Sequence, residues 1–151
     1  MIEINGMAHV ILTVSQFDEA KDFYGRLMPA LGLECVFDGS DMCYFVGGRT
    51  ALGLQPCDPA YAGERFIQGR VGLHHVCFRA RSRDDVDQVA ALLEDMNAHI
   101  VSPAKEGPWA PGYYYVLCED PDGIRVEVNF VPGRGVLAED ESFNPADYSK
   151  K

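Results

Sequence analysis

The sequence predicts an α+β fold built from two copies of one βαβββ module. Residues 7–14 (MAHVILTV) are echoed by residues 73–80 (LHHVCFRA), with His9 and His75 at matched places before a valine. A serine and a helix-like apolar pattern follow each run, and three short strand-like segments follow each helix. Alternating and helical periodicities repeated in the same order are typical of an internal duplication.

The first module begins with a predicted strand at residues 8–14. Ser15 is predicted to cap the following helix, with Asp18 three residues later, and Gly32 to end it. Apolar residues recur at helical spacing between them. Three strands are expected at residues 33–37, 42–46 and 50–55, separated by turn-rich segments.

The second module repeats this course with a strand at residues 72–80, a helix capped by Ser82, and strands at 99–101, 113–118 and 124–130. A turn at residues 120–123 joins the last two strands. Residues 104–112, rich in proline and glycine, are predicted to form an irregular loop that contains Trp109, the only tryptophan. Such a loop either covers a ligand or packs on the surface.

Length and composition favour one compact domain. The chain has 151 residues, 47% of them hydrophobic. We expect this domain at residues 1–131, with modules at about 5–58 and 70–131 and an irregular tail at 132–151. No apolar run is long enough to span a membrane and no signal pattern opens the chain, which favours a cytoplasmic protein.

Charge and cysteine content narrow the function classes. A net charge of −10 disfavours nucleic acid and anionic membranes as partners, because phosphate binding requires clustered Lys and Arg. A small molecule is therefore the expected partner. The five cysteines are odd in number and form no C-x-x-C pair, which indicates reduced, mostly packed thiols.

The strands divide into two faces. One phase of each strand is uniformly apolar and is expected to pack against the helix. The other phase concentrates polar groups: His9, His75, Arg125, Glu127 and Asn129. If the two modules turn these faces toward each other, they enclose a polar pocket. His74 falls on the helix-facing phase and is expected to be structural.

These motifs resemble the vicinal oxygen chelate superfamily, which includes glyoxalase I, extradiol dioxygenases and bleomycin-resistance proteins. The resemblance is carried by Ala8-His9-Val10, by the helix end Phe23-Tyr24 to Leu31-Gly32-Leu33, by His74-His75-Val76-Cys77-Phe78, and by residues 119–127 (EDPDGIRVE). It covers residues 7 to about 131. It implies the glyoxalase/bleomycin resistance/dihydroxybiphenyl dioxygenase fold and a homodimer.

The resemblance also implies a metal site. Position by position, the four ligand places of the metal-binding members fall on His9, Gly53, His75 and Glu127, and glyoxalase I has Glu or Gln where this chain has Gly53. Glyoxalase I itself is therefore disfavoured. Two imidazoles and one carboxylate suit one divalent ion: Fe, Mn, Zn, Ni or Co.

Three functions remain open at this point. The first is a metal-dependent lyase or isomerase acting on a small molecule with vicinal oxygens. The alternatives are an extradiol-type dioxygenase and a metal-free, bleomycin-resistance-like binding protein. Tyr113, Tyr115 and Arg125 are the candidate catalytic residues, and Trp109, Gln55, Arg79 and Asn129 the candidate substrate contacts.

Overall fold

The computed structural model describes residues 2–137, so most of the tail predicted at 132–151 lies outside the described residues. The chain divides into two compact units. The first comprises residues up to 67 together with 120–124, and the second comprises 68–119 and the chain from 125 onward. No helix among the described residues is long and apolar enough to cross a membrane.

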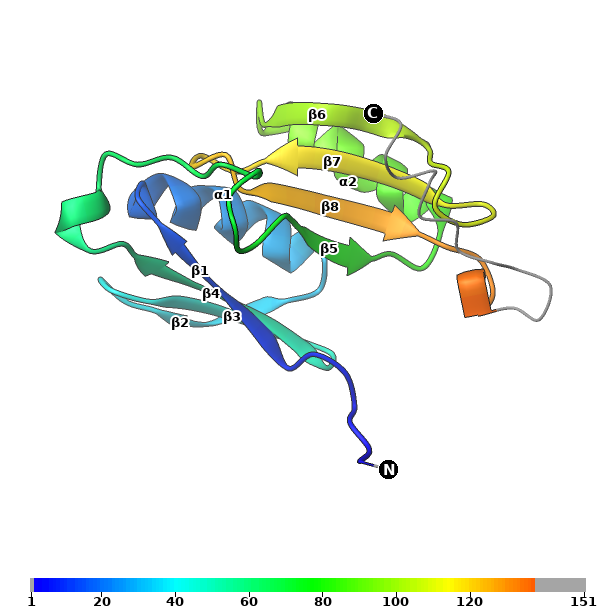
Figure 1. The fold of residues 1–151 in the computed structure, drawn as a ribbon, viewed down its shortest axis with the longest axis horizontal. Coiled ribbons are helices and arrows are strands. Elements are labelled where there is room, and N and C mark those ends of the chain that lie inside the picture. Colours follow the sequence, from blue (N-terminus) through cyan, green and yellow to red (C-terminus); the bar gives the residue numbers. More distant parts are fainter. Residues whose placement is uncertain (1, 138–151) are drawn as a thin grey trace. The chain divides into compact units, whose positions relative to one another are not determined.

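The first unit has the predicted βαβββ order. Its elements are β1 (His9–Val14), α1 (Phe17–Ala30), β2 (Glu34–Asp38), β3 (Cys43–Gly47) and β4 (Thr50–Pro56), followed by the short helix η1 (Pro59–Tyr61). The strands form one sheet in the order β1-β4-β3-β2 (Figure 1). β1 and β4 run parallel, whereas the other neighbours are antiparallel.

The core of this unit forms between α1 and the apolar phase of the sheet. The helix buries one stripe of side chains: Ala20, Phe23, Tyr24, Leu27 and Met28. The sheet buries the alternate positions Leu12, Val14, Phe45, Leu52 and Leu54. The helix repeats every 3.6 residues and the strands every 2 residues, so each places its apolar side chains on one face. These faces pack together, as the sequence pattern predicted.

The predicted Ser15 cap is wrong. The residue at the cap position of α1 is Gln16, which makes no side-chain cap bond. The carboxylate of Asp122 instead accepts hydrogen bonds from the backbone N–H of Ser15 at 2.8 Å and of Gln16 at 3.2 Å, and from the Ser15 hydroxyl. A carboxylate at a helix N-terminus satisfies free N–H groups and complements the helix dipole, so the serine is not needed as the cap.

The second unit repeats the order with β5 (Val76–Arg79), α2 (Arg83–Asp95), β6 (His99–Glu106), β7 (Tyr114–Glu119) and β8 (Arg125–Phe130), and ends at the short helix η2 (Gly135–Leu137). Its sheet has the order β5-β8-β7-β6, and α2 packs on one face of it (Figure 1). The Ser82 cap is confirmed, because its side chain accepts from Asp85 N–H.

Two strands of this unit differ from prediction. β5 begins at Val76 rather than at residue 72, because its partner β8 begins only at Arg125 and leaves residues 72–74 without a neighbour. β6 extends to Glu106, so residues 104–106 are strand rather than loop. β6 is an edge strand, and Pro103 lies in the register shift between Ser102 and Lys105, where the regular ladder is interrupted and a proline is tolerated.

The turn between β7 and β8 belongs to the first unit. Within it, the Asp120 carboxylate accepts from the backbone N–H of Asp122 and Ile124, and Gly123 adopts a positive φ of 87°. The Tyr24 hydroxyl of α1 donates to the same carboxylate at 3.0 Å. The turn is therefore fixed both by its own backbone and by the helix.

All five cysteines are free thiols, as predicted, but only some of them are packed in the interior. Cys43 and Cys118 are buried, Cys57 is intermediate, and Cys35 and Cys77 are exposed. Cys77 lies beside the polar residues described next.

Candidate metal centre

A buried carboxylate occupies the middle of the second unit's sheet. Glu127 on β8 pairs with Cys77 on β5 and with Leu117 on β7, and only 5% of its surface is exposed. A carboxylate in this position requires partners, because burying an unpaired charge is costly. Its two oxygens have different neighbours.

One oxygen of Glu127 faces His75. The distance from His75 Nε2 to Glu127 Oε2 is 3.5 Å. Burial lowers the pKa of the His75 imidazole, and the nearby Glu127 charge opposes this shift only in part. The imidazole is therefore neutral near pH 7, which is the form that binds a metal ion.

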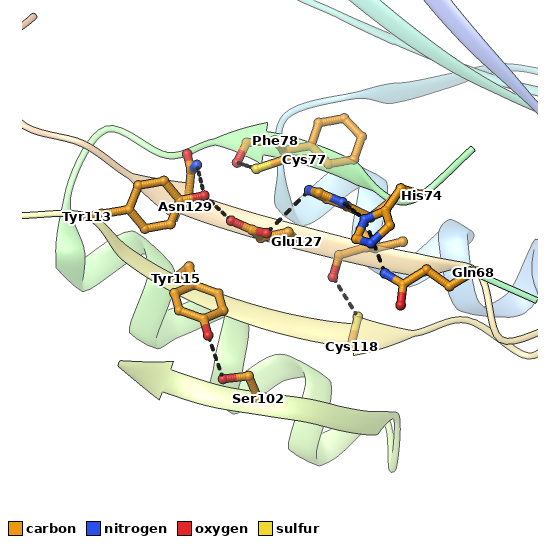
Figure 2. Close-up of polar contacts among 12 residues, drawn as sticks. Gln68, His74, Cys77, Phe78, Ser102, Tyr113, Tyr115, Cys118, Glu127 and Asn129 are labelled. Carbon is orange, nitrogen blue, oxygen red and sulfur yellow. Dashed lines mark hydrogen bonds and ion pairs between the residues drawn. The ribbon is translucent and has the colours of Figure 1, made fainter. Parts of the chain in front are cut away.

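The other oxygen of Glu127 is held by Tyr113 and Asn129. Asn129 Nδ2 donates to the Tyr113 hydroxyl at 2.8 Å, and this hydroxyl donates to Glu127 Oε1 (Figure 2). Burial and the Glu127 contact raise the pKa of Tyr113, so the phenol keeps its proton. Oε1 is thus engaged within the protein, while Oε2 is directed toward His75.

Cys77 is a member of this cluster that sequence reasoning did not select. It lies directly opposite Glu127 in the β5–β8 register. Although part of the residue is exposed to solvent, loss of hydration around the thiol, followed by the Glu127 charge, raises the pKa of this group. The thiol is therefore protonated at neutral pH. The signal was present in the sequence, because Cys77 shares the strand phase of His75.

Trp109 belongs to an aromatic cluster with Tyr113 and Tyr115. Its ring centroid lies 5.0 Å from each of the two tyrosine rings, in edge-on geometry. A Cβ atom on Gly107 would lie 2.6 Å from the Trp109 ring, so only glycine allows this close approach. Tyr115 is buried and its hydroxyl accepts from Ser102, which directs it away from Glu127 (Figure 2).

The prediction that His74 faces the helix is wrong. Both adjacent histidines precede β5, so the strict alternation of a strand does not separate their side chains. The Nδ1 atoms of His74 and His75 are 2.7 Å apart, and Gln68 Nε2 lies 3.2 Å from His74 Nδ1 (Figure 2). His74 therefore contacts the candidate ligand directly.

The other candidate residues lie apart from this cluster or on its margin. Arg125 Nε binds Glu119 Oε1 at 3.3 Å rather than Glu127. Arg79 is exposed and lies opposite Asn129 in the register. Gln55 belongs to the first unit, where its amide donates to the Thr13 hydroxyl.

The first unit reproduces the same strand register without the carboxylate. Ile11 pairs with Gly53 as Cys77 pairs with Glu127, so Gly53 occupies the place that is equivalent to Glu127. A Cβ atom there would lie 2.5 Å from Ile11 Cδ1 and 2.9 Å from Tyr44 Cδ2. The side chains of Ile11 and Tyr44 close this place. His9, on the same strand as Ile11, is exposed.

The residues of the second unit fit two ligands of one divalent ion. Ligand bonds of 2.0–2.2 Å at octahedral or tetrahedral angles separate neighbouring donor atoms by about 2.8–3.6 Å, a range that includes the 3.5 Å between His75 Nε2 and Glu127 Oε2. Imidazole and carboxylate are ligands that Zn, Fe, Mn, Co and Ni accept. Across residues 2–137, no group of three His, Cys, Asp or Glu side chains is arranged to hold a metal.

Comparison with known proteins identifies the family. The sequence model of the Glyoxalase/Bleomycin resistance protein/Dioxygenase superfamily matches residues 6–128. The chain belongs to this superfamily. The family resemblance and the α+β fold of two βαβββ modules predicted from the sequence are thereby confirmed.

Two proteins of known sequence illustrate what the chain is similar to. YqjT, an uncharacterised protein of Bacillus subtilis (strain 168), is 30% identical over 124 residues, which cover 81% of this chain and 96% of YqjT. Biphenyl-2,3-diol 1,2-dioxygenase 2 of Rhodococcus globerulus is 26% identical over 132 residues, covering 80% of this chain but only 60% of that enzyme.

Solved structures of the superfamily share the fold. A candidate glyoxalase from Bacillus halodurans superposes with a TM-score of 0.74 at 28% identity, covering 84% of this chain and 96% of that one. Lactoylglutathione lyase from Agrobacterium tumefaciens gives a TM-score of 0.61 at 25% identity, with 84% and 94% covered. Lyase and dioxygenase names thus both occur among the relatives.

Proposed function

We propose that this chain is a divalent-metal-dependent enzyme of the superfamily, acting on a small molecule with two adjacent oxygens. The observation that supports this most strongly is the pairing of His75 Nε2 with Glu127 Oε2 at 3.5 Å inside one unit. An ordinary structural ion pair would need a protonated imidazole, whereas the pKa of His75 is lowered. A neutral imidazole beside a carboxylate oxygen suits a shared cation.

His75 and Glu127 would hold the ion, and the family resemblance adds His9 as the third ligand. When bound, the ion would supply Lewis-acid stabilisation of negative charge on the substrate oxygens. The protein's own contribution is positional. Tyr113 and Asn129 restrain one carboxylate oxygen of Glu127 and leave the other for the ion.

Other residues near the pair are proposed to contact the substrate. Trp109 packs against Tyr113, which in turn binds Glu127, so the indole lies one side chain away from the proposed ligand. Asn129 Oδ1 is buried and has no hydrogen-bond partner among the described residues. It is an acceptor that a substrate hydroxyl would satisfy.

Within this function, lyase or isomerase chemistry is the first proposal and extradiol-type cleavage the second. The second is favoured by the likeness to the Rhodococcus dioxygenase and by Ile11 and Tyr44, which close the place of a fourth ligand at Gly53. A ligand set of two histidines and one glutamate leaves several positions for substrate and O2. Consumption of O2 with a catechol substrate, measured with an oxygen electrode, distinguishes the two.

Metal titration of metal-free protein tests the proposal. Isothermal titration with Fe(II), Mn(II), Zn(II), Co(II) and Ni(II) should give one ion per chain for at least one metal. His75→Ala and Glu127→Gln should each abolish this stoichiometric binding, and His9→Ala tests the third ligand separately. His99→Ala is the matched control, because His99 lies near Glu119 rather than Glu127.

The contrary result is equally clear. If the wild-type protein binds no stoichiometric metal, and His75→Ala and Glu127→Gln do not differ from it, the chain is instead a metal-free binding protein.

We also propose a homodimer and a cytoplasmic location from the family resemblance and the composition. The molar mass measured by light scattering tests the first of these.

A further inference from the structure

The side chain next to the proposed ligand is itself a histidine, and the two imidazoles touch. His74 Nδ1 and His75 Nδ1 are 2.7 Å apart, a distance at which one nitrogen must donate a proton and the other accept it. On the far side, Gln68 Nε2 lies 3.2 Å from the same His74 Nδ1. His74 is exposed and Gln68 is half-buried.

The chemistry of Gln68 determines which nitrogen carries the proton. An amide nitrogen only donates, so His74 Nδ1 must offer its lone pair to Gln68. An unprotonated His74 Nδ1 has no proton to give to His75, so His75 must be the donor in their contact through its own Nδ1–H, and the two donors share the one lone pair of His74 Nδ1. A neutral imidazole has one N–H group, so His75 Nε2 is left with a free lone pair on the side that faces Glu127.

The distance to Glu127 agrees with this assignment. If the proton of His75 were on Nε2, it would donate to Glu127 Oε2, and such a bond requires about 2.7–3.2 Å. The observed separation is 3.5 Å. An unprotonated Nε2 cannot donate to the carboxylate, so a separation longer than a hydrogen bond is expected. His75 Nε2 and Glu127 Oε2 would instead both bind one cation placed between them.

We propose that Gln68 and His74 are positioning residues that hold His75 in its Nδ1–H form, so that Nε2 is ready to bind a metal ion. The part of this inference that concerns metal affinity rests on the proposed function. Metal-binding histidines commonly donate their second ring N–H to a neighbouring acceptor, which fixes both tautomer and ring orientation. Here the acceptor is another histidine, whose own state is set by an amide.

The proposal predicts that two of three variants change the state of His75 and that the third preserves it. Gln68→Glu replaces the donor with a carboxylate, which accepts only, so His74 must turn an N–H toward it and can no longer accept from His75. His74→Asn keeps an acceptor oxygen near the place of Nδ1 and should preserve the state of His75. His74→Phe removes the acceptor altogether.

The ¹⁵N chemical shifts of the metal-free protein at about pH 8, where an ordinary histidine is neutral, test the tautomer directly. The four histidines of the chain allow assignment by single variants. Wild type and His74→Asn should show His75 protonated at Nδ1, whereas Gln68→Glu and His74→Phe should shift the proton to Nε2. A wild-type Nε2–H form, or an unchanged His75 in both of the last two variants, would overturn the proposal.

Zn(II) affinity, measured by competition with a chromophoric chelator, provides the second readout. Gln68→Glu and His74→Phe should weaken Zn(II) binding about 10- to 100-fold, and His74→Asn should restore most of it, with His99→Phe as the control. If wild type binds no Zn(II) or other metal but the tautomer result holds, only the proposed function fails. If wild type binds Zn(II) and all variants match it, only the positioning role fails.

Discussion

Ile11 lies directly opposite Gly53, and a Cβ atom on that glycine would be 2.5 Å from Ile11 Cδ1. Gly53→Ala should therefore destabilise the protein by about 1–3 kcal/mol, the usual cost of overpacking. Ile11→Val removes the clashing Cδ1 and should recover part of this loss in the double variant. The recovery is incomplete because the new Cβ atom still lies too close to the Tyr44 ring. Urea unfolding of the single and double variants measures both effects.

Gly25 offers a matched control for that prediction. It lies on the exposed side of α1, and a Cβ atom there would meet nothing within 4 Å. Gly25→Ala should stabilise the protein by about 0.5–1 kcal/mol, since alanine loses less backbone entropy in a helix. Equal destabilisation by both alanine substitutions would show that the close approach at Gly53 is not the cause.

The buried Asp120 should make stability depend on pH in an unusual direction. Burial raises its pKa from 3.8 to about 6, although hydrogen bonds from Ile124 N–H and the Tyr24 hydroxyl oppose the shift. Between these two values the folded state holds the proton more tightly than the unfolded state. The contribution of Asp120 therefore falls as pH rises from about 4 to 6, by up to about 3 kcal/mol.

Asp120→Asn should remove this slope while keeping an acceptor for the two backbone N–H groups. The measurement is the difference in unfolding free energy between wild type and variant at several pH values, which cancels the other carboxylates. Asp41→Asn, in the exposed turn after β2, is the control. A difference that stays constant from pH 4 to 7 would contradict the prediction.

Asp122 should stabilise α1 more than Ser15 does. Asp122→Ala leaves the N–H groups of Ser15 and Gln16 without their acceptor, and we expect a loss of about 2 kcal/mol. Ser15→Ala removes only the hydroxyl contact and should cost less. Thermal and urea unfolding followed by circular dichroism measure the order, and a larger loss for Ser15→Ala would restore the serine as the main cap.

Tyr113→Phe should weaken metal binding without abolishing it. The variant frees Glu127 Oε1 from its donor, so the carboxylate is less well oriented, and a loss of about 10-fold in affinity is expected. Tyr114→Phe is the matched control, because the Tyr114 hydroxyl donates to Asp87 on α2. Chelator competition should leave Tyr114→Phe equal to wild type; equal losses in both variants would argue against the restraint.

Strand phase and duplication predicted the fold from the sequence, and they selected His75 and Glu127, whose side chains lie close together in the structure. The pairing of Ile11 with Gly53 and of Cys77 with Glu127 reproduces the alignment of the two copies. The prediction for His74 was wrong because β5 begins only where its parallel neighbour β8 begins, so His74 lies before the strand and does not follow its alternation. Asp122 as the cap of α1 was not predictable either, since the partners are 107 residues apart.

That separation has a consequence for how the chain is made. During synthesis α1 leaves the ribosome long before Asp122, so the first unit is incomplete until the residues that follow β7 have been translated. Contacts between distant segments slow folding, because a long loop must close before they form. A nascent chain that stops at residue 67 would therefore leave the N-terminus of α1 without the Asp122 carboxylate. The first unit can complete its contacts only when β8, the strand that carries Glu127, is about to be translated.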